Sequence, residues 1–337
     1  MTGTRTTVLG TTIGTAVGTA GSIALAALVA RRLLAPAPYR ATATVRSSTR
    51  TEALLDATRD TRLPGTYGLQ RSGRRERIGT VLGVDGDAVR RAVSEPVDPG
   101  VWEWDALMAD SPDDVPGEEP ATTARTHVVH VHGQALGPRQ VLRGLAVWRS
   151  LGASNTIVDT TDLPLRSLDP AAADRIVAAV RAARADGAER VVLQGWSAGA
   201  LACAVAADRE HVDGIVGVAP LLSMASALRG AVRAAHLPSV VGSLAARTAS
   251  TPLVCRLAGT NDPVAVTTWP DRTTPTLLLH STADALVSAD DVAAQAARAG
   301  VTAVAFHTAP HTLEWNEDPV RWDDAVRRFA AEVAPTP

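Results

Sequence analysis

Residues 191–199 read VVLQGWSAG, and this stretch decides the fold. An apolar run typical of a buried strand leads directly into Gly195-Trp196-Ser197-Ala198-Gly199, and an Ala-rich helical run follows. The turn between such a strand and helix is so tight that the positions two before and two after the serine, Gly195 and Gly199, have no room for a side chain. The turn lifts the serine hydroxyl above the sheet edge, at a helix N-terminus that favours developing negative charge. The pattern predicts a nucleophilic Ser197.

A nucleophilic serine needs a base, and the base needs a carboxylate that orients it. In the α/β-hydrolase fold, for which G-x-S-x-G is typical, these residues follow in the order serine, acid, histidine, each after a later strand. Two later apolar runs, at residues 276–279 and 301–306, end just before Asp284 and His311. We therefore expect Ser197, Asp284 and His311 to form a catalytic triad.

Other residues near these strand ends have simpler explanations. His307 and His280 stand at strand ends, where we expect a packed histidine or one pointing across the sheet. Asp290 and Asp291 open a helix, and a helix N-terminus is sufficient reason for an acidic residue. These alternatives rank behind Asp284 and His311.

An oxyanion hole should complete the site, with two backbone N–H donors. One is expected from Ala198, the residue after the nucleophile, and the other from Gln134, in the loop after the strand at residues 128–131. In the same loop His132 could be mistaken for a base. We expect it to hold the loop around Gly133 instead.

The pattern from Thr126 onward is a series of short apolar strands alternating with helices, which predicts a mostly parallel, doubly wound sheet covered on both faces. The segment 221–269 interrupts the alternation and is expected to form a small cap. The α/β-hydrolase domain would span residues 122–337.

A small β-rich extension is expected over residues 51–121. It should begin with a short helix near residues 52–57 and continue with strands near 65–69, 77–82 and 88–93. An exposed acidic loop at 109–121 would end it, and residues 31–50 would be a linker.

Residues 6–30 carry no charge and are long enough, at about 37 Å of helix, to span a membrane. We therefore expect a transmembrane helix or signal anchor, and a cell-membrane, single-pass protein. Small residues at every fourth position, from Gly10 to Ala30, would allow two such helices to form a homodimer. Arginines after the span favour a cytoplasmic catalytic domain. If the segment is instead a cleaved signal peptide, the protein is secreted.

Composition excludes other classes of function. A formal net charge of -2 gives no bulk electrostatic reason to bind nucleic acid. The chain has 2 cysteines, and neither Cys203 nor Cys255 shows the spacing of a metal site. We expect no metal and no cofactor.

The assembled motifs resemble those of actinobacterial α/β-hydrolases with an N-terminal membrane anchor, related to the prolyl-oligopeptidase and dienelactone-hydrolase branch. The likeness covers roughly residues 62–334. Its motifs are PGTYGL at 64–69, VHG at 131–133, GWSAG at 195–199, LLH at 278–280 leading to Asp284, and HTLEWN at 311–316. Relatives carry Tyr-Arg-Asn where this chain has DTTD at 159–162, so substrate contacts of that loop do not carry over.

The resemblance implies a hydrolase of unspecified substrate. We expect hydrolysis of ester, thioester or small amide bonds in a small molecule, through an acyl-enzyme on Ser197. Two alternatives remain open: a non-catalytic, membrane-anchored binding protein on the same fold, and an acyltransferase that uses the same triad.

Overall fold

The computed structural model describes most of the 337-residue chain. It covers residues 41–106, 125–134, 136–164, 166–238, 240, 243, 268–270 and 273–333. The expected membrane span at 6–30, the acidic loop at 109–121 and most of the second half of the expected cap lie outside these residues. No helix in the described part of the chain is long and apolar enough to cross a membrane.

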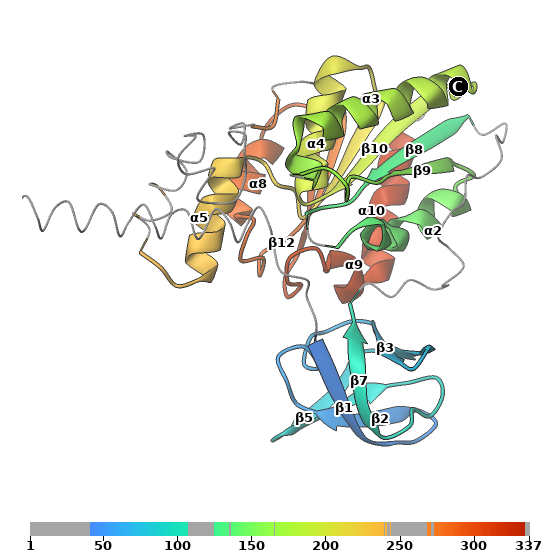
Figure 1. The fold of residues 1–337 in the computed structure, drawn as a ribbon, viewed down its shortest axis with the longest axis vertical. Helices are drawn as coiled ribbons and strands as arrows, with labels where there is room; N and C mark the ends of the chain where they lie inside the picture. The colour runs from blue at the N-terminus through green and yellow to red at the C-terminus, as the bar shows by residue number, and fades with distance from the viewer. Residues whose placement is uncertain are drawn as a thin grey trace, which may run out of the picture.

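The described chain forms two sheets, one after the other along the sequence, and each has its own domain (Figure 1). The small domain is a seven-stranded antiparallel sheet in the order β4-β3-β7-β1-β2-β6-β5. Its strands are β1 (Ala41–Ser48), β2 (Glu52–Asp56), β3 (Tyr67–Arg71), β4 (Arg74–Ile78), β5 (Val81–Asp85), β6 (Ala88–Ala92) and β7 (Gly100–Asp105). Alternate residues of these strands enclose a core around Trp102 and Trp104.

This domain corrects three expectations. Ala41–Ser48 is a strand in the middle of the sheet and not part of a linker, because Ala43 and Val45 alternate inward. Glu52–Asp56 is a strand and not a helix, since its apolar residues also alternate between buried and half-buried positions. The strand expected at 77–82 is two strands, β4 and β5, separated by Gly79 and Thr80.

The large domain is a six-stranded sheet in the order β13-β12-β11-β10-β8-β9, and all of its recorded pairings are parallel. The strands are β8 (Thr126–Val131), β9 (Ser154–Val158), β10 (Arg190–Trp196), β11 (Gly214–Val218), β12 (Thr276–Ser281) and β13 (Val301–Phe306). The helices are α2 (Leu142–Ser150), α3 (Pro170–Ala185), α4 (Ala198–Arg209), α5 (Met224–Ala234), α8 (Ala289–Ala296), α9 (Glu314–Glu317) and α10 (Pro319–Glu332). This is the parallel, doubly wound architecture expected from the sequence.

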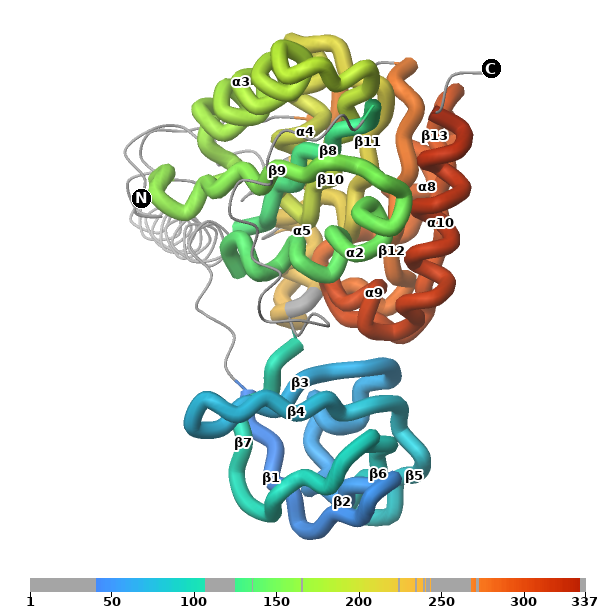
Figure 2. Tube along the Cα trace, turned by 90° about the vertical axis from the view of Figure 1, so that its right-hand side faces the viewer, coloured from blue at the N-terminus to red at the C-terminus, as the bar shows by residue number. Residues whose placement is uncertain are grey.

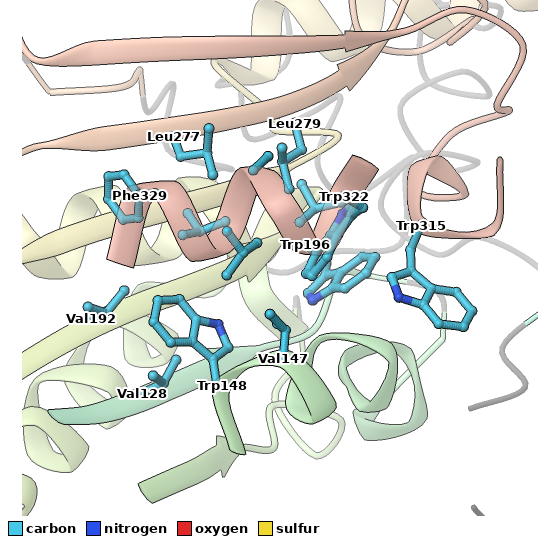
Figure 3. Packing of buried hydrophobic residues seen from close by; sticks show 14 of the residues in the cluster. Val128, Val147, Trp148, Val192, Trp196, Leu277, Leu279, Trp315, Trp322 and Phe329 are labelled. Carbon is cyan, nitrogen blue, oxygen red and sulfur yellow. The ribbon is translucent and has the colours of Figure 1, made fainter. Parts of the chain in front are cut away.

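Helices cover both faces of this sheet because residues of each strand point alternately to either side. On one face Val191 and Leu193 of β10 pack against α3 and α4. On the other, Val192 and Trp196 pack against α2 and α10 (Figure 3). The core on this second face includes four buried tryptophans, Trp148, Trp196, Trp315 and Trp322, and the rings of Trp196 and Trp322 stack 6.0 Å apart. β10 is therefore buried on both sides and holds its C-terminal turn firmly.

The two ends of the segment expected to form the cap lie side by side. Ser223 and Thr268 form an antiparallel bridge, and the Trp269 N–H donates to the Leu222 carbonyl. Helix α5 follows this bridge and packs beside the loop after β12, where a Cβ on Gly230 would lie 2.1 Å from the Leu286 carbonyl oxygen.

The small domain docks against one end of the large one. Helix α9 lies at the edge of the large domain that faces the small sheet in both views (Figures 1 and 2). The Thr66 N–H donates to the Asn316 carbonyl at 3.0 Å, and Arg139 pairs with Asp105 at 2.8 Å.

Candidate active site

Ser197 lies at the turn between β10 and α4, at the carboxyl edge of the parallel sheet. Its backbone has φ 54° and ψ −116°, a left-handed conformation that a non-glycine residue rarely adopts. The Ser197 N–H donates to the Val218 carbonyl at 2.8 Å, and its own carbonyl accepts from Leu221 at 3.0 Å. These bonds to the end of β11 fix the turn and hold the hydroxyl above the sheet.

The glycines around Ser197 are required by close approach. A Cβ on Gly195 would lie 2.4 Å from the backbone of Ala200, and one on Gly199 would lie 2.5 Å from the Val131 carbonyl oxygen. A Cβ on Gly133, in the loop after β8, would lie 3.1 Å from the Ser197 Cβ. The chain therefore brings the loop after β8 directly against the serine.

The structure brings Ser197, His311 and Asp284 into one hydrogen-bonded chain. The Nε2 atom of His311 lies 2.8 Å from the Ser197 hydroxyl, and its Nδ1 atom lies 2.7 Å from the Asp284 carboxylate. Because a carboxylate can only accept, Nδ1 carries the hydrogen and Nε2 of the neutral ring is left to accept the serine proton. This arrangement has the geometry of a nucleophile, a base and an orienting acid.

Asp284 is held in its ionised form. Burial alone would raise its pKa, but His311 and the backbone N–H groups of Leu286 and Val287 outweigh burial and lower the pKa. One carboxylate oxygen accepts from these two N–H groups at 2.7 and 3.1 Å, and the other faces His311. The Asp284 side chain is fully buried, whereas the His311 side chain is 24% exposed and reachable from solvent.

The loop between β13 and α9 carries His311, and we call residues 307–313 the base loop. It is fixed by Glu317 of α9. Its carboxylate accepts from the N–H groups of His307, Thr308 and Ala309 at 2.6 to 3.1 Å. Burial favours a raised pKa, yet these donors outweigh it and lower the pKa of Glu317. Glu317 is not among the residues expected from the sequence, because it lies ten positions after the strand-end His307 and no local pattern links the two.

Side chains from neighbouring turns hold three backbone groups of the loop after β8. The Gly133 N–H donates to Gln140 Oε1 at 2.7 Å, Arg166 donates to the Gln134 carbonyl, and Ser167 donates to the His132 carbonyl. Gln140, Arg166 and Ser167 lie on the short turns before α2 and α3. None of these three residues is expected in the site from the sequence, because their bonds join different segments of the chain.

His132 lies under this loop, fully buried. Its Nε2 accepts from the Thr160 N–H at 3.0 Å, so the hydrogen is on Nδ1, which donates to the Gly133 carbonyl at 2.7 Å. Both ring nitrogens are thus engaged with backbone groups, which fits the expected role in holding the Gly133 loop.

The other candidates for the base and the acid are not part of the hydrogen-bonded chain formed by Ser197, His311 and Asp284. His307 is exposed and not packed as expected, because its backbone, not its ring, is tied down by Glu317. His280 is buried, and burial lowers its pKa although the Asp284 charge opposes this. Asp290 and Asp291 lie in the first turn of α8, where Asp291 accepts from Ser226 of α5.

A buried carboxyl lies next to these residues. Glu314 is 0% exposed, and burial raises its pKa well above the usual value, with a further rise from the Asp284 charge. Burial therefore favours the protonated, neutral form of this carboxyl over the ionised form. No group of three or more His, Cys, Asp or Glu side chains in the described ranges is arranged to hold a metal ion.

The large domain has the α/β-hydrolase fold, as the parallel sheet and the Ser197 turn after its central strand β10 establish. Solved structures similar to it include an esterase of Pyrococcus furiosus, at 16% identity over 62% of this chain and 83% of that chain, with a TM-score of 0.46. The proline iminopeptidase-related protein of Thermus thermophilus matches at 18% identity, over 64% of this chain and 92% of that chain, with a TM-score of 0.44. Est1E from Butyrivibrio proteoclasticus, with ferulic acid bound, matches at 16% identity, over 66% of this chain and 92% of that chain, with a TM-score of 0.41.

The small domain is similar to one family of proteins. Residues 44–103 match the family described as Domain of unknown function (DUF8805), and these bounds run from β1 to β7. No curated protein sequence matches the chain.

Proposed function

We propose that the protein is a serine hydrolase that cleaves ester, thioester or small amide bonds of a small molecule through an acyl-enzyme on Ser197. The observation that carries this proposal is the unbroken hydrogen-bonded chain from the Ser197 hydroxyl through His311 to Asp284. A neutral, oriented imidazole next to a serine hydroxyl is what general-base activation requires.

In the first half of the reaction the Ser197 oxygen attacks the substrate carbonyl carbon while His311 Nε2 takes the hydroxyl proton. Asp284 stabilises the imidazolium that results. The tetrahedral intermediate then collapses, and His311 gives the proton to the departing alcohol, thiol or amine. In the second half His311 deprotonates a water molecule that attacks the acyl-enzyme, which releases the carboxylic acid and restores Ser197.

The negative oxygen of each tetrahedral intermediate needs two N–H donors. We assign these to Ala198 and Gln134. Ala198 opens α4 directly after the nucleophile, where the helix dipole adds favourable charge. In the loop after β8 the Gly133 N–H is already used by Gln140, which favours the next residue, Gln134, as the second donor.

Turnover of an ester series tests this function. The wild-type protein should hydrolyse p-nitrophenyl esters of some acyl length. Ser197→Ala should reduce kcat by about 10⁴-fold or more, because the triad acts as a unit. A matched control is Ser150→Ala, which changes an exposed serine at the end of α2 whose hydroxyl donates to the Val147 carbonyl of the same helix. Equal rates for the wild type and Ser197→Ala would rule out the proposed mechanism, and release of an ester instead of an acid in the presence of an alcohol would identify an acyltransferase.

A further inference from the structure

The two domains meet at a contact that only glycine allows. Gly65, just before β3 of the small domain, has φ 92°, and a Cβ there would lie 1.6 Å from the Asn316 carbonyl oxygen of α9. Next to it the Thr66 N–H donates to that same carbonyl at 3.0 Å. The small domain is therefore seated on α9 by its backbone, at a residue five positions after His311.

The Asn316 side chain joins this contact to the interior of the large domain. It is 0% exposed. Its Nδ2 donates to the carbonyls of Thr66 and Ala106 at 2.7 and 3.2 Å, and both belong to the small domain. Its Oδ1 accepts from the Arg143 guanidinium of α2. An amide is the group that can donate on one side and accept on the other, so this position suits asparagine and not aspartate.

Arg143 contacts residues next to the nucleophile and next to the oxyanion loop, by which we mean residues 132–134 after β8. Its guanidinium lies 4.6 Å from the ring centroid of Trp196, the residue before Ser197. It also lies 3.5 Å from the carbonyl of Gln140, whose side chain holds the Gly133 N–H. Burial lowers the pKa of Arg143 to about 10, so the group stays charged at neutral pH and depends on these partners.

The small domain presents Gly65 on a similarly fixed segment. The buried guanidinium of Arg91 donates to the carbonyls of Thr61, Leu63 and Gly65 at 2.6 to 2.8 Å. It also lies 5.3 Å from the ring centroid of Tyr67. These bonds leave the segment before β3 little freedom to yield when the contact with α9 is strained.

An apolar contact adds to the same interface. Leu313, two residues after His311, packs against the core of the small domain. Between His311 and Asn316 the chain is thus held by the small domain at both Leu313 and Asn316. Because these contacts lie two and five residues after His311, a displacement of the small domain would be transmitted to the base loop.

We propose that the small domain is a positioning element for the catalytic loops, and that Asn316 is the positioning residue through which it acts. Docking of Gly65 and Thr66 on α9 holds the base loop directly, and holds Trp196 and the oxyanion loop through Arg143 and Gln140. This inference gives residues 44–103 a role within the chain, and it rests on the proposed hydrolase function only for its kinetic readout.

A pair of glycine substitutions separates docking from backbone strain. Gly65→Ala places a methyl group into the Asn316 carbonyl, whereas Gly73→Ala has a similar φ of 82° and no atom within 4 Å of the new Cβ. Both variants carry the same kind of left-handed strain within the same domain. We expect Gly65→Ala to lower kcat by about 100-fold with KM little changed, because the misplaced loops act in the transition state. Gly73→Ala should keep the wild-type kcat.

A second pair tests Asn316 itself. Asn316→Asp keeps an acceptor for Arg143 but replaces the donor to Thr66 and Ala106, so it should also lower kcat. Arg181→Gln removes an ion pair to Glu210 within the large domain, whose arginine side chain is 68% exposed, and should keep the wild-type kcat. If Gly65→Ala does not fold, this pair decides the question. Equal kcat values within both pairs would overturn the proposal.

Amide hydrogen exchange tests the same coupling without any substrate. The reporters are the Thr308 and Ala309 amides, which Glu317 binds, and the Gly133 amide, which Gln140 binds. We expect these amides to exchange about tenfold faster in Asn316→Asp or Gly65→Ala than in the control variants. Unchanged exchange in a folded Asn316→Asp would overturn the proposal even if the wild type is active. Faster exchange would support it even if the wild type shows no hydrolase activity.

Discussion

The Nε2 atom of His311 lies 2.8 Å from the Ser197 hydroxyl, although 114 residues separate them in the chain. His311→Ala should therefore reduce kcat almost as much as Ser197→Ala. His307→Ala should leave kcat near the wild-type value, because the side chain is exposed and an alanine keeps the backbone N–H that Glu317 binds. Ester kinetics of both variants, with circular dichroism to verify folding, check this. A large loss at His307 with His311 tolerated would reverse the assignment.

Asp284→Asn should lower kcat by about 10⁴-fold, because an amide can present its N–H₂ to the imidazole and favour the wrong tautomer. The bonds from Leu286 and Val287 can persist to the amide oxygen, so the fold should survive. Asp290→Asn, at the exposed start of α8, is the matched control and should keep full activity. A comparable loss in both variants would assign the effect to this end of the fold and not to the acid.

Glu314 makes a prediction about stability and pH. Below about pH 4.5 the folded and unfolded states both bind the Glu314 proton, whereas above it only the folded state does, because its pKa is raised. The wild type thus loses stability as pH rises, and Glu314→Gln does not share this loss. The Tm of the variant minus that of the wild type should grow as pH rises above about 4.5.

Glu317→Gln is the control with the opposite sign. Its folded-state pKa is lowered, so its contribution to stability is present at neutral pH and is lost as pH falls through that pKa. The Tm of the wild type should therefore be higher than that of Glu317→Gln, and this difference should be largest at neutral pH. A Tm difference for Glu314→Gln that grows toward acid pH would contradict the raised pKa of Glu314.

The uncharged run at residues 6–30 predicts membrane attachment. Full-length protein should sediment with membranes and resist extraction by high salt and carbonate. A chain that begins at Arg40 should stay in the supernatant with unchanged kcat, since the described structure begins at Ala41 and contains every residue of the proposed triad. Mature protein that starts near Ala27 and appears in the medium would identify a signal peptide instead.

The sequence predicted the large domain well because its signals are local. Buried parallel strands appear as short apolar runs, and the Ser197 turn needs glycine at fixed positions. The small domain was predicted less well. Ala41–Ser48 and Glu52–Asp56 carry few large apolar residues, and their alternation reveals a strand only once a partner sheet buries one face.

The residues that hold the loops could not be predicted from the sequence. Asn316, Arg143 and Gln140 derive their roles from bonds between segments up to 250 residues apart, such as that from Asn316 to Thr66. No local pattern records such a contact. Both segments were singled out as the motifs PGTYGL at 64–69 and HTLEWN at 311–316, but the sequence does not reveal that Gly65 of the first packs against Asn316 of the second.

Covalent labelling of Ser197 tests the central claim most directly. The folded full-length protein is treated with a fluorophosphonate probe, and the modified peptide is identified by mass spectrometry, with heat-denatured protein and Ser197→Ala as controls. The account predicts one adduct, on Ser197, that forms only in the folded wild type and forms more slowly in His311→Ala. No adduct on folded protein at any pH, or an adduct that persists in Ser197→Ala, would contradict it.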